Sequence, residues 1–170
     1  MANSGEPLEE IAIVGVRTGL HDPKETLARV QAFARSRNGW AQLLDAAHVM
    51  GEDHVRSACD HARRAIERGT QTTNSLELEV LLYASGEHQI ARAINQIGVK
   101  PGRSFVVVLG GGVRPKEVLE QFRFIPDDDV VKPSTRKLRA LGFTAKEIET
   151  AGDTATDLAL ELVARVDLLK

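Results

Sequence analysis

The residues best suited to chemistry lie together where the segment Ser85-Gly86-Glu87-His88-Gln89 precedes an apolar helical stretch. Gly86 predicts a break between two helices, so we expect the first backbone N–H groups of the second helix to face solvent or a ligand. These donors lie at the positive end of the helix dipole and suit a phosphate or a nucleotide end. The Gln89 amide suits a base edge, and the His88 ring offers a face on which a base can stack.

Two residues upstream extend this hypothesis. Asn74 offers paired donors and acceptors for a base edge, and Tyr83 offers a second ring face. The alternative interpretation is that Asn74, Ser85 and Gln89 serve only to cap helices.

The chain also contains three consecutive glycines, Gly110-Gly111-Gly112, after the β-branched stretch Phe105–Leu109. We expect a flexible turn there, and glycine amides at such a turn can approach a phosphate. The turn has neither the Gly-Lys-Ser/Thr ending of a P-loop nor the spacing of a dinucleotide loop. A structural turn is therefore favoured, and a nucleotide-binding small-molecule enzyme that uses these glycines is the alternative.

Other catalytic chemistry lacks support in the sequence. Of the five histidines, His54 and His61 share a helical face, but no third metal ligand follows from the pattern. Ser85 is not in a Gly-x-Ser-x-Gly elbow, and Cys59 falls on the apolar side of its helix. We therefore expect no catalytic residue, no metal and no cofactor, and we expect that the protein is not an enzyme.

Hydrophobic periodicity predicts which elements carry these residues. Runs rich in apolar and β-branched residues predict strands at Ile11–Val16, Trp40–Ala47 and Phe105–Leu109. Helical patterns lie between them and fill the C-terminal third, at 22–37, 53–68, 76–84, 87–97, 134–141, 144–149 and 154–169. This order predicts an α+β fold with a small mixed or antiparallel sheet, several helices packed on it and a helical C-terminal third. Residues 1–8 are expected to be a flexible N-terminus, and residues 9–170 a single domain.

Helix starts are predicted from capping residues. Asp22 followed by Pro23 predicts one N-terminus, Asp53 a second, and the Asn74–Glu77 segment a capping box. On the second helix, Cys59 and Ile66 share the period of the apolar face, so both are expected in the core.

Charge and composition limit the partners. The formal net charge of −2 gives no general attraction to polyanions, so any nucleic-acid site must be local. Residues 54–103 have seven Lys or Arg against five acids, a modest excess. No apolar run approaches the roughly 20 residues that cross a bilayer, so no membrane contact is expected. One cysteine and no recognisable signal peptide predict the cytoplasm, and also the nucleus in a eukaryote.

The last predicted helix has two apolar stripes. One comprises Ala155, Leu158, Ala159, Leu162, Val163, Val166 and Leu169, and the other comprises Leu160, Ala164 and Leu168. A helix that is apolar on two sides is either enclosed by its own core or packs partly on another protein. The sequence leaves open which stripe faces outward.

The segment from Asn74 to Val99 resembles the PRPK-binding protein family. The resemblance is carried by Asn74-Ser75-Leu76-Glu77 and by the string from Leu81 through Tyr83-Ala84-Ser85-Gly86-Glu87-His88-Gln89-Ile90 to Ile94, followed by Gly98-Val99. Supporting similarity extends upstream through Leu43–Gly69. His88 stands where the family pattern has arginine, so a permanent charge is replaced by a titratable one.

The resemblance implies a noncatalytic subunit of the KEOPS complex, which makes threonylcarbamoyladenosine in tRNA. Such a subunit binds and stimulates a PRPK-type kinase/ATPase and holds the single-stranded 3′ CCA end of tRNA. Carried over by position, the tRNA site comprises Asn74, Ser75, Ser85, Gly86, His88, Gln89 and Ile90, with Arg63, Arg64 and Arg68 near the phosphates. The kinase-binding residues would be Leu160, Val163, Val166 and Leu169. An adaptor that binds protein and no RNA is the remaining alternative.

Overall fold

Three antiparallel strands form the centre of the computed structural model, which describes residues 10–170. The strands are β1 (Ala12–Val16), β2 (Gly39–Asp45) and β3 (Phe105–Gly111), and β3 lies between the other two. Strand β2 ends earlier than expected because the Asp45 side chain accepts a hydrogen bond from the Ala47 amide and starts a short 3-10 helix, Ala46–His48. The antiparallel sheet confirms the predicted α+β class, while the N-terminus predicted to be flexible lies outside the described residues.

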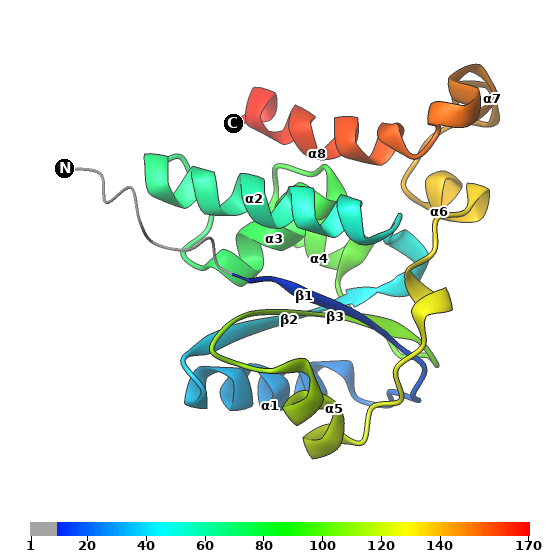
Figure 1. The fold of residues 1–170 in the computed structure, drawn as a ribbon. Helices are drawn as coiled ribbons and strands as arrows, with labels where there is room; N and C mark the ends of the chain where they lie inside the picture. Colours follow the sequence, from blue (N-terminus) through cyan, green and yellow to red (C-terminus); the bar gives the residue numbers. More distant parts are fainter. Residues whose placement is uncertain (1–9) are drawn as a thin grey trace.

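Helices cover both faces of this sheet (Figure 1). Below it lie α1 (Pro23–Ser36) and α5 (Pro115–Phe122), which pack on the face carrying Phe105, Val107 and Leu109. Above it lie α2 (Glu52–Arg68), α3 (Leu76–Ser85) and α4 (Ile90–Ile97), which pack on the face carrying Val106 and Val108. Strand β3 is apolar at successive positions because it is buried on both sides.

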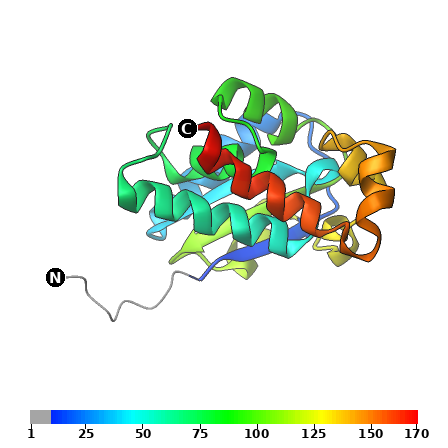
Figure 2. The ribbon, with the colours of Figure 1, turned by 90° about the horizontal axis from the view of Figure 1, so that it is seen from above.

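The C-terminal third is helical, as predicted. Helices α6 (Thr135–Ala140) and α7 (Ala145–Ala151) lie at one end of the sheet, and α8 (Asp157–Leu169) crosses the top of α2 and α3 (Figures 1 and 2). Short 3-10 turns, Asp128–Val131 and Gly152–Thr154, connect these elements. Among the described residues, no helix is long and apolar enough to cross a membrane.

Some predicted helix starts are correct and others are shifted. Asp22 accepts a hydrogen bond from the Glu25 amide at 3.1 Å and caps α1, as expected. Asp53 does not cap α2, which begins one residue earlier, after Gly51. Ser75, and not Asn74, caps α3 by accepting from the Leu78 amide. Helix α4 begins at Ile90, three residues later than expected, so Glu87, His88 and Gln89 form the connection before it.

Only Gly112, the last of the three glycines, lies in a turn. Gly110 and Gly111 belong to β3 and pair with Trp40 and Gly39 of β2. A Cβ atom on Gly110 would collide with the Trp40 indole, and one on Gly111 would lie 2.7 Å from the Gly39 Cα. Close packing of two strands therefore explains Gly110 and Gly111, and the three glycines do not together form the flexible turn on which the nucleotide-binding alternative depended.

Candidate functional site

The predicted tRNA residues divide between the two ends of α3. Asn74 and Ser75 precede its first residue, whereas Ser85 is its last residue and Gly86 follows it. A ten-residue helix is about 15 Å long, so the two groups are separated by about that distance. The predicted tRNA residues therefore form two patches, and an extended strand that touched both would have to span this distance.

At the C-terminal end of α3, only part of the predicted set is accessible. Ser85 is buried, and its hydroxyl donates to the Leu82 carbonyl while accepting from the Glu87 amide. Gly86 adopts the left-handed conformation (φ +76°) and backs onto Leu162 of α8. His88 and Gln89 are exposed, and Ile90 is half-buried against the core. Ser85 and Gly86 thus shape the turn that presents His88 and Gln89.

Helix α4 offers backbone donors beside His88 and Gln89. Its cap residue Gln89 makes no side-chain hydrogen bond to the first turn. The early N–H groups of α4 consequently lack a side-chain acceptor among the described residues, and the first turn contains no acid. The patch matches the predicted donor set, although it begins after Gln89 and not at Ser85.

A groove of about 450 Å³ lies next to Ser75 at the other end of α3. It separates α1 from α3 and α4 and has apolar walls formed by Leu27, Leu78, Leu81, Ile94 and Val99. Lys24 and Arg35 of α1 also line it, together with Glu77 and the neutral polar side chains Gln31, Gln42 and Ser75. The two cations outnumber the one acid, so the apolar walls, the net positive charge and the hydrogen-bonding groups together suit an unstacked base with its phosphate.

Sequence reasoning missed this groove. Leu27 and Ile94 are apolar residues of the kind that helical periodicity places in a core, but neither is fully enclosed, and Ile94 is 46% exposed. They belong to two helices that are about 65 residues apart in the chain and meet only in the folded protein. A partly exposed apolar residue on each side of a cleft is a signal that needs the tertiary structure to interpret.

The three predicted arginines lie on α2. Arg64 and Arg68 are exposed, and Arg68 ends the helix six residues before Asn74. Arg63 is half-buried near Asp60 (3.9 Å) and faces a smaller hollow with Trp40 and Leu76. Arg68 therefore belongs with the Asn74 group, whereas none of the three lies in the His88 turn.

Tyr83 is not the stacking platform that we expected. It is fully buried, its hydroxyl donates to Asp167, and Lys170 lies over its ring. Burial and the hydrogen bond to Asp167 raise the pKa of Tyr83. The residue fastens α3 to α8 and has no face available to a base.

A polar network around Tyr83 fixes α8 in place. Asp167 accepts from Tyr83 and contacts the His61 ring at 2.9 Å, and these hydrogen bonds lower its pKa against the opposing effect of burial. Glu79, fully buried, accepts from the Thr72 and Thr73 amides and pairs with Lys170 at 3.0 Å. Helix α8 is consequently held in one rotational setting about its axis.

That setting decides which stripe of α8 faces outward. Val163 and Val166 are buried in the core cluster that α8 shares with α2 and α3, so these two predicted kinase contacts lie inside the protein's own core. Ala159 and Leu162 are buried in a separate cluster with Leu138 and Leu141. Leu160 is half-buried, while Leu168 and Leu169 are 84% and 50% exposed. The second stripe, Leu160, Ala164 and Leu168, is the accessible one. Figure 2 shows that no other element covers α8 from above.

The histidines act within the fold and do not gather into a metal site. His54 is buried, its Nδ1 accepts from the Met50 amide and its Nε2–H donates to the Ala84 carbonyl. Burial lowers the pKa of His54 to about 4. His48 contacts Asp45, and His61 contacts Asp167. Within residues 10–170, no three His, Cys, Asp or Glu side chains lie close enough together to hold a metal ion.

A family model described as kinase binding protein CGI-121 matches residues 20–150 of the chain. A search of curated proteins finds no match. The matched region contains the groove, both ends of α3 and the whole sheet except β1, and it ends before α8.

Proposed function

Because this chain belongs to the CGI-121 family of kinase-binding proteins, whose model covers about three quarters of its length, we propose that it is a noncatalytic KEOPS-type subunit. In this role it binds and stimulates a PRPK-type kinase/ATPase and holds the single-stranded 3′ CCA end of tRNA. The cytoplasm, with the nucleus added in a eukaryote, is the proposed location.

The accessible apolar stripe of α8 supports the kinase-binding part. Leu168 is the most exposed large apolar residue among those described, and it shares this stripe with Leu160. Exposed apolar side chains in a row on one helix are typical of a surface that a partner covers. The proposed kinase face is therefore Leu160, Ala164, Leu168 and the adjoining Leu169.

Co-purification with a PRPK-type kinase tests this face. We expect Leu160→Glu and Leu168→Glu to lower kinase recovery at least tenfold, because a carboxylate would be desolvated at the contact. Ile125→Glu is the matched control, since Ile125 is 64% exposed and lies outside α8. Val163→Glu is unsuitable, because a carboxylate at that fully buried position would unfold the protein. Undiminished recovery with both α8 variants would remove the proposed face.

The groove beside Ser75 and the amides after Gln89 support the RNA-binding part. The groove suits an unpaired nucleotide, because a base inside a duplex is stacked and cannot enter it, and the amides after Gln89 suit the phosphate of a neighbouring nucleotide. An extended 3′ end that entered the groove could continue along α4 to the His88 turn. Base contacts in the groove and phosphate contacts at α4 would then divide recognition between them.

Binding of intact tRNA, compared with tRNA lacking its CCA end, tests this part. We expect at least tenfold weaker binding of the shortened tRNA. Ile94→Glu should weaken binding of intact tRNA by a similar factor, because it puts a further negative charge in the groove, and Leu168→Glu, at an exposed position on α8, should not. Equal affinities for the two tRNAs would refute the CCA assignment, and an absence of salt-dependent tRNA binding would favour the protein-only adaptor.

A further inference from the structure

A row of four phenylalanine rings leads from the core to the lower face of the molecule. Phe105 of β3 meets Phe124 edge-on at 4.9 Å, Phe124 stacks on Phe122 at 5.6 Å, and Phe122 meets Phe33 edge-on at 5.7 Å. Phe105 is buried, whereas Phe33 and Phe122 are half-buried between α1 and α5. The rings that reach the lower face are therefore held in place by contacts that lead back to Phe105 in the sheet.

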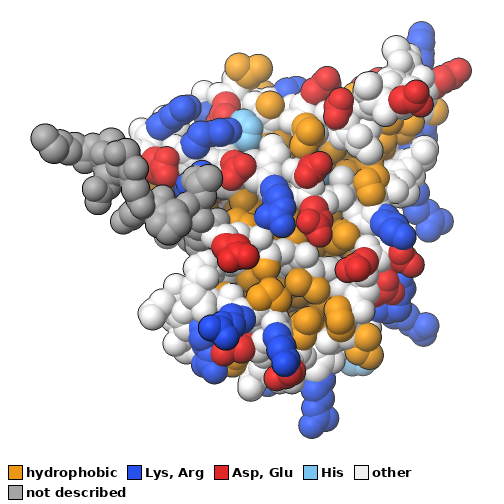
Figure 3. All heavy atoms as spheres, viewed as in Figure 1, with side chains coloured by type: hydrophobic (Ala, Val, Ile, Leu, Met, Phe, Trp, Pro, Cys, Tyr) orange, Lys and Arg blue, Asp and Glu red, His pale blue; other side chains and the backbone are white. Residues whose placement is uncertain are grey.

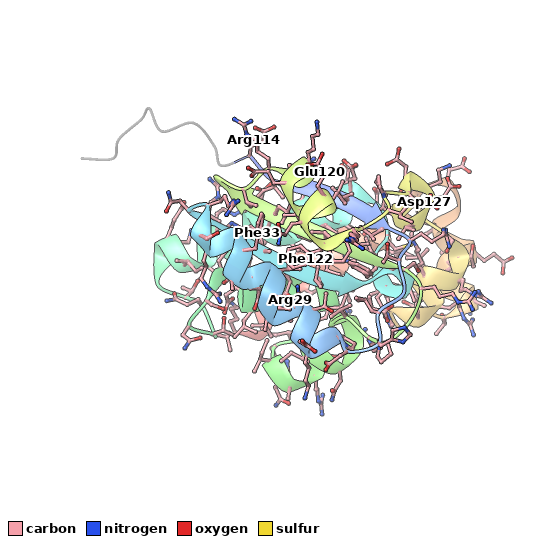
Figure 4. All side chains as sticks on the ribbon, turned by 90° about the horizontal axis from the view of Figure 1, so that it is seen from below. Arg29, Phe33, Arg114, Glu120, Phe122 and Asp127 are labelled. Carbon is pink, nitrogen blue, oxygen red and sulfur yellow. The ribbon has the colours of Figure 1, made fainter. Side chains whose placement is uncertain are left out.

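Two arginines lie over these rings. The guanidinium of Arg37 is 4.1 Å from the centre of the Phe33 ring, and that of Arg29 is 5.6 Å from the centre of Phe122. Figure 4 shows Arg29 and Phe33 of α1 beside Phe122 of α5. Arg37 also donates from Nη1 to the Ser36 hydroxyl at 2.9 Å, so its position is partly fixed before any ligand arrives, and its other N–H groups are left for a phosphate.

The same face carries an excess of unpaired positive charge. Residues 22–37 and 114–123 contain seven Lys or Arg against four Asp or Glu, in a chain whose net charge is −2, and two of the seven, Lys24 and Arg35, also line the groove beside Ser75. All seven cations are exposed, and within residues 10–170 only Lys116 among them has a carboxylate within salt-bridge distance. Figure 3 shows Lys and Arg side chains along the lower edge of the molecule. Three of the four acids have local roles: Asp22 and Glu117 cap helices, and Glu120 is the partner of Lys116.

Exposed cations, two of them held over phenylalanine rings, favour a polyanion as the ligand. The rings also indicate which kind of polyanion it is. Phe33 and Phe122 already contact each other and carry the arginines, so their faces are not available for unstacked bases. Arginine edges spread over two helices can instead contact successive phosphates. A duplex presents such phosphates on its outside, and double-stranded RNA is recognised largely by shape and backbone.

We propose that the face formed by α1 and α5 binds the phosphate backbone of double-stranded RNA, with the phenylalanine-stacked Arg29 and Arg37 as its central contacts. This inference goes beyond the proposed function, because neither Arg29 nor Arg37 lines the groove and the face lies on the opposite side of the sheet from the His88 turn (Figure 1). A duplex bound here would leave that turn free for a separate single-stranded end.

The test is fluorescence anisotropy with a blunt RNA duplex that has no CCA end, measured at several salt concentrations. The full chain is compared with a triple variant, Arg29→Gln, Arg37→Gln and Arg123→Gln. We expect at least tenfold weaker binding and a plot of log affinity against log salt that is shallower by about three, about one for each lost phosphate contact. The matched control removes three exposed cations elsewhere, through Arg136→Gln, Arg139→Gln and Lys146→Gln, and should bind as the unmodified chain does.

Three results would overturn the proposal. They are equal losses in the two triple variants, no duplex binding by the unmodified chain, and binding of anionic phospholipid vesicles in place of RNA. A single-stranded oligonucleotide ending in CCA is measured in parallel. If the unmodified chain binds the duplex but not this oligonucleotide, the proposed CCA role is refuted and the duplex surface stands. If it binds the oligonucleotide but not the duplex, the duplex surface is refuted and the CCA role stands.

Discussion

Acidification should weaken the fold chiefly through one buried imidazole, that of His54. Its Nδ1 accepts the Met50 N–H at 3.0 Å, so the proton must reside on Nε2, which donates to the Ala84 carbonyl at 2.8 Å. A second proton on Nδ1 would face a donor and would have to be buried with its charge. The ring therefore joins the loop before α2 to the end of α3 only in its neutral form.

The size of the effect follows from the two pKa values. The folded pKa is about 4 and the ordinary value is 6.5, so the unfolded chain takes up the proton first as the pH falls. The stability contributed by neutral His54 is complete above pH 6.5 and is lost between 6.5 and 4. Linkage gives a loss of about 2 kcal/mol at pH 5 and about 3 kcal/mol at pH 4.

Urea unfolding from pH 7.5 to 4 measures this loss. His54→Asn should be less stable at pH 7 by about 1–3 kcal/mol, because the Ala84 carbonyl loses its donor. Its free energy of unfolding should nevertheless fall less with acid, so that the two curves converge near pH 4. The exposed His21 provides the control, since His21→Asn should follow the unmodified protein. If His54→Asn has the same pH dependence as the unmodified chain, the assignment of the titration to His54 is wrong.

Other perturbations test the packing and the polar network by chemical denaturation. Gly86→Ala should cost about 2–4 kcal/mol, because a left-handed residue acquires a Cβ that collides with Leu162. Gly69 is also left-handed but has open space around it, so Gly69→Ala should cost only about 1 kcal/mol. Equal losses in the two variants would contradict the collision. Glu79→Ala should cost about 3–5 kcal/mol, because it removes a fully buried carboxylate that pairs with Lys170 and accepts from the Thr72 and Thr73 amides. Glu67→Ala, at an exposed position, should stay within about 0.5 kcal/mol of the unmodified chain. Gly110→Ala should cost at least about 2 kcal/mol and shift the fluorescence of Trp40, the single tryptophan, since the new methyl group would collide with the indole; an unchanged spectrum would argue against that contact. Burial raises the pKa of Asp45, but hydrogen bonds from His48, the Ala47 amide and Lys100 outweigh it and hold this pKa at about 2. Protonation of Asp45 should therefore add a further loss of stability only below about pH 4, and Asp45→Asn should remove this additional loss.

Local rules predicted the elements whose signals are contained within a few residues. The cap at Asp22 and the stop at Gly86 depend on neighbouring backbone groups alone, and both are found. Strand β3 was evident because burial on both faces requires an unbroken apolar run.

Features that depend on distant partners could not be predicted in this way. Gly110 requires no side chain because Trp40, 70 residues earlier, occupies the space. The orientation of α8 depends on the bonds that Asp167 and Lys170 make to α2 and α3, so the sequence alone could not place Val163 and Val166 inside. The tRNA residues came from a resemblance in the motif, which does not reveal that α3 separates them into two patches.

The central position of β3 constrains the order in which a nascent chain can fold. Residue 12 has its partner at residue 109, and residue 45 has its partner at residue 105, while β1 and β2 do not pair with each other. During synthesis, both early strands must wait until the ribosome has released the third. Contacts that join residues so far apart close slowly, because the intervening chain loses much conformational entropy. Release of residues 105–111 is thus the earliest moment at which a cooperative core can form, and chains halted before that point should remain protease-sensitive.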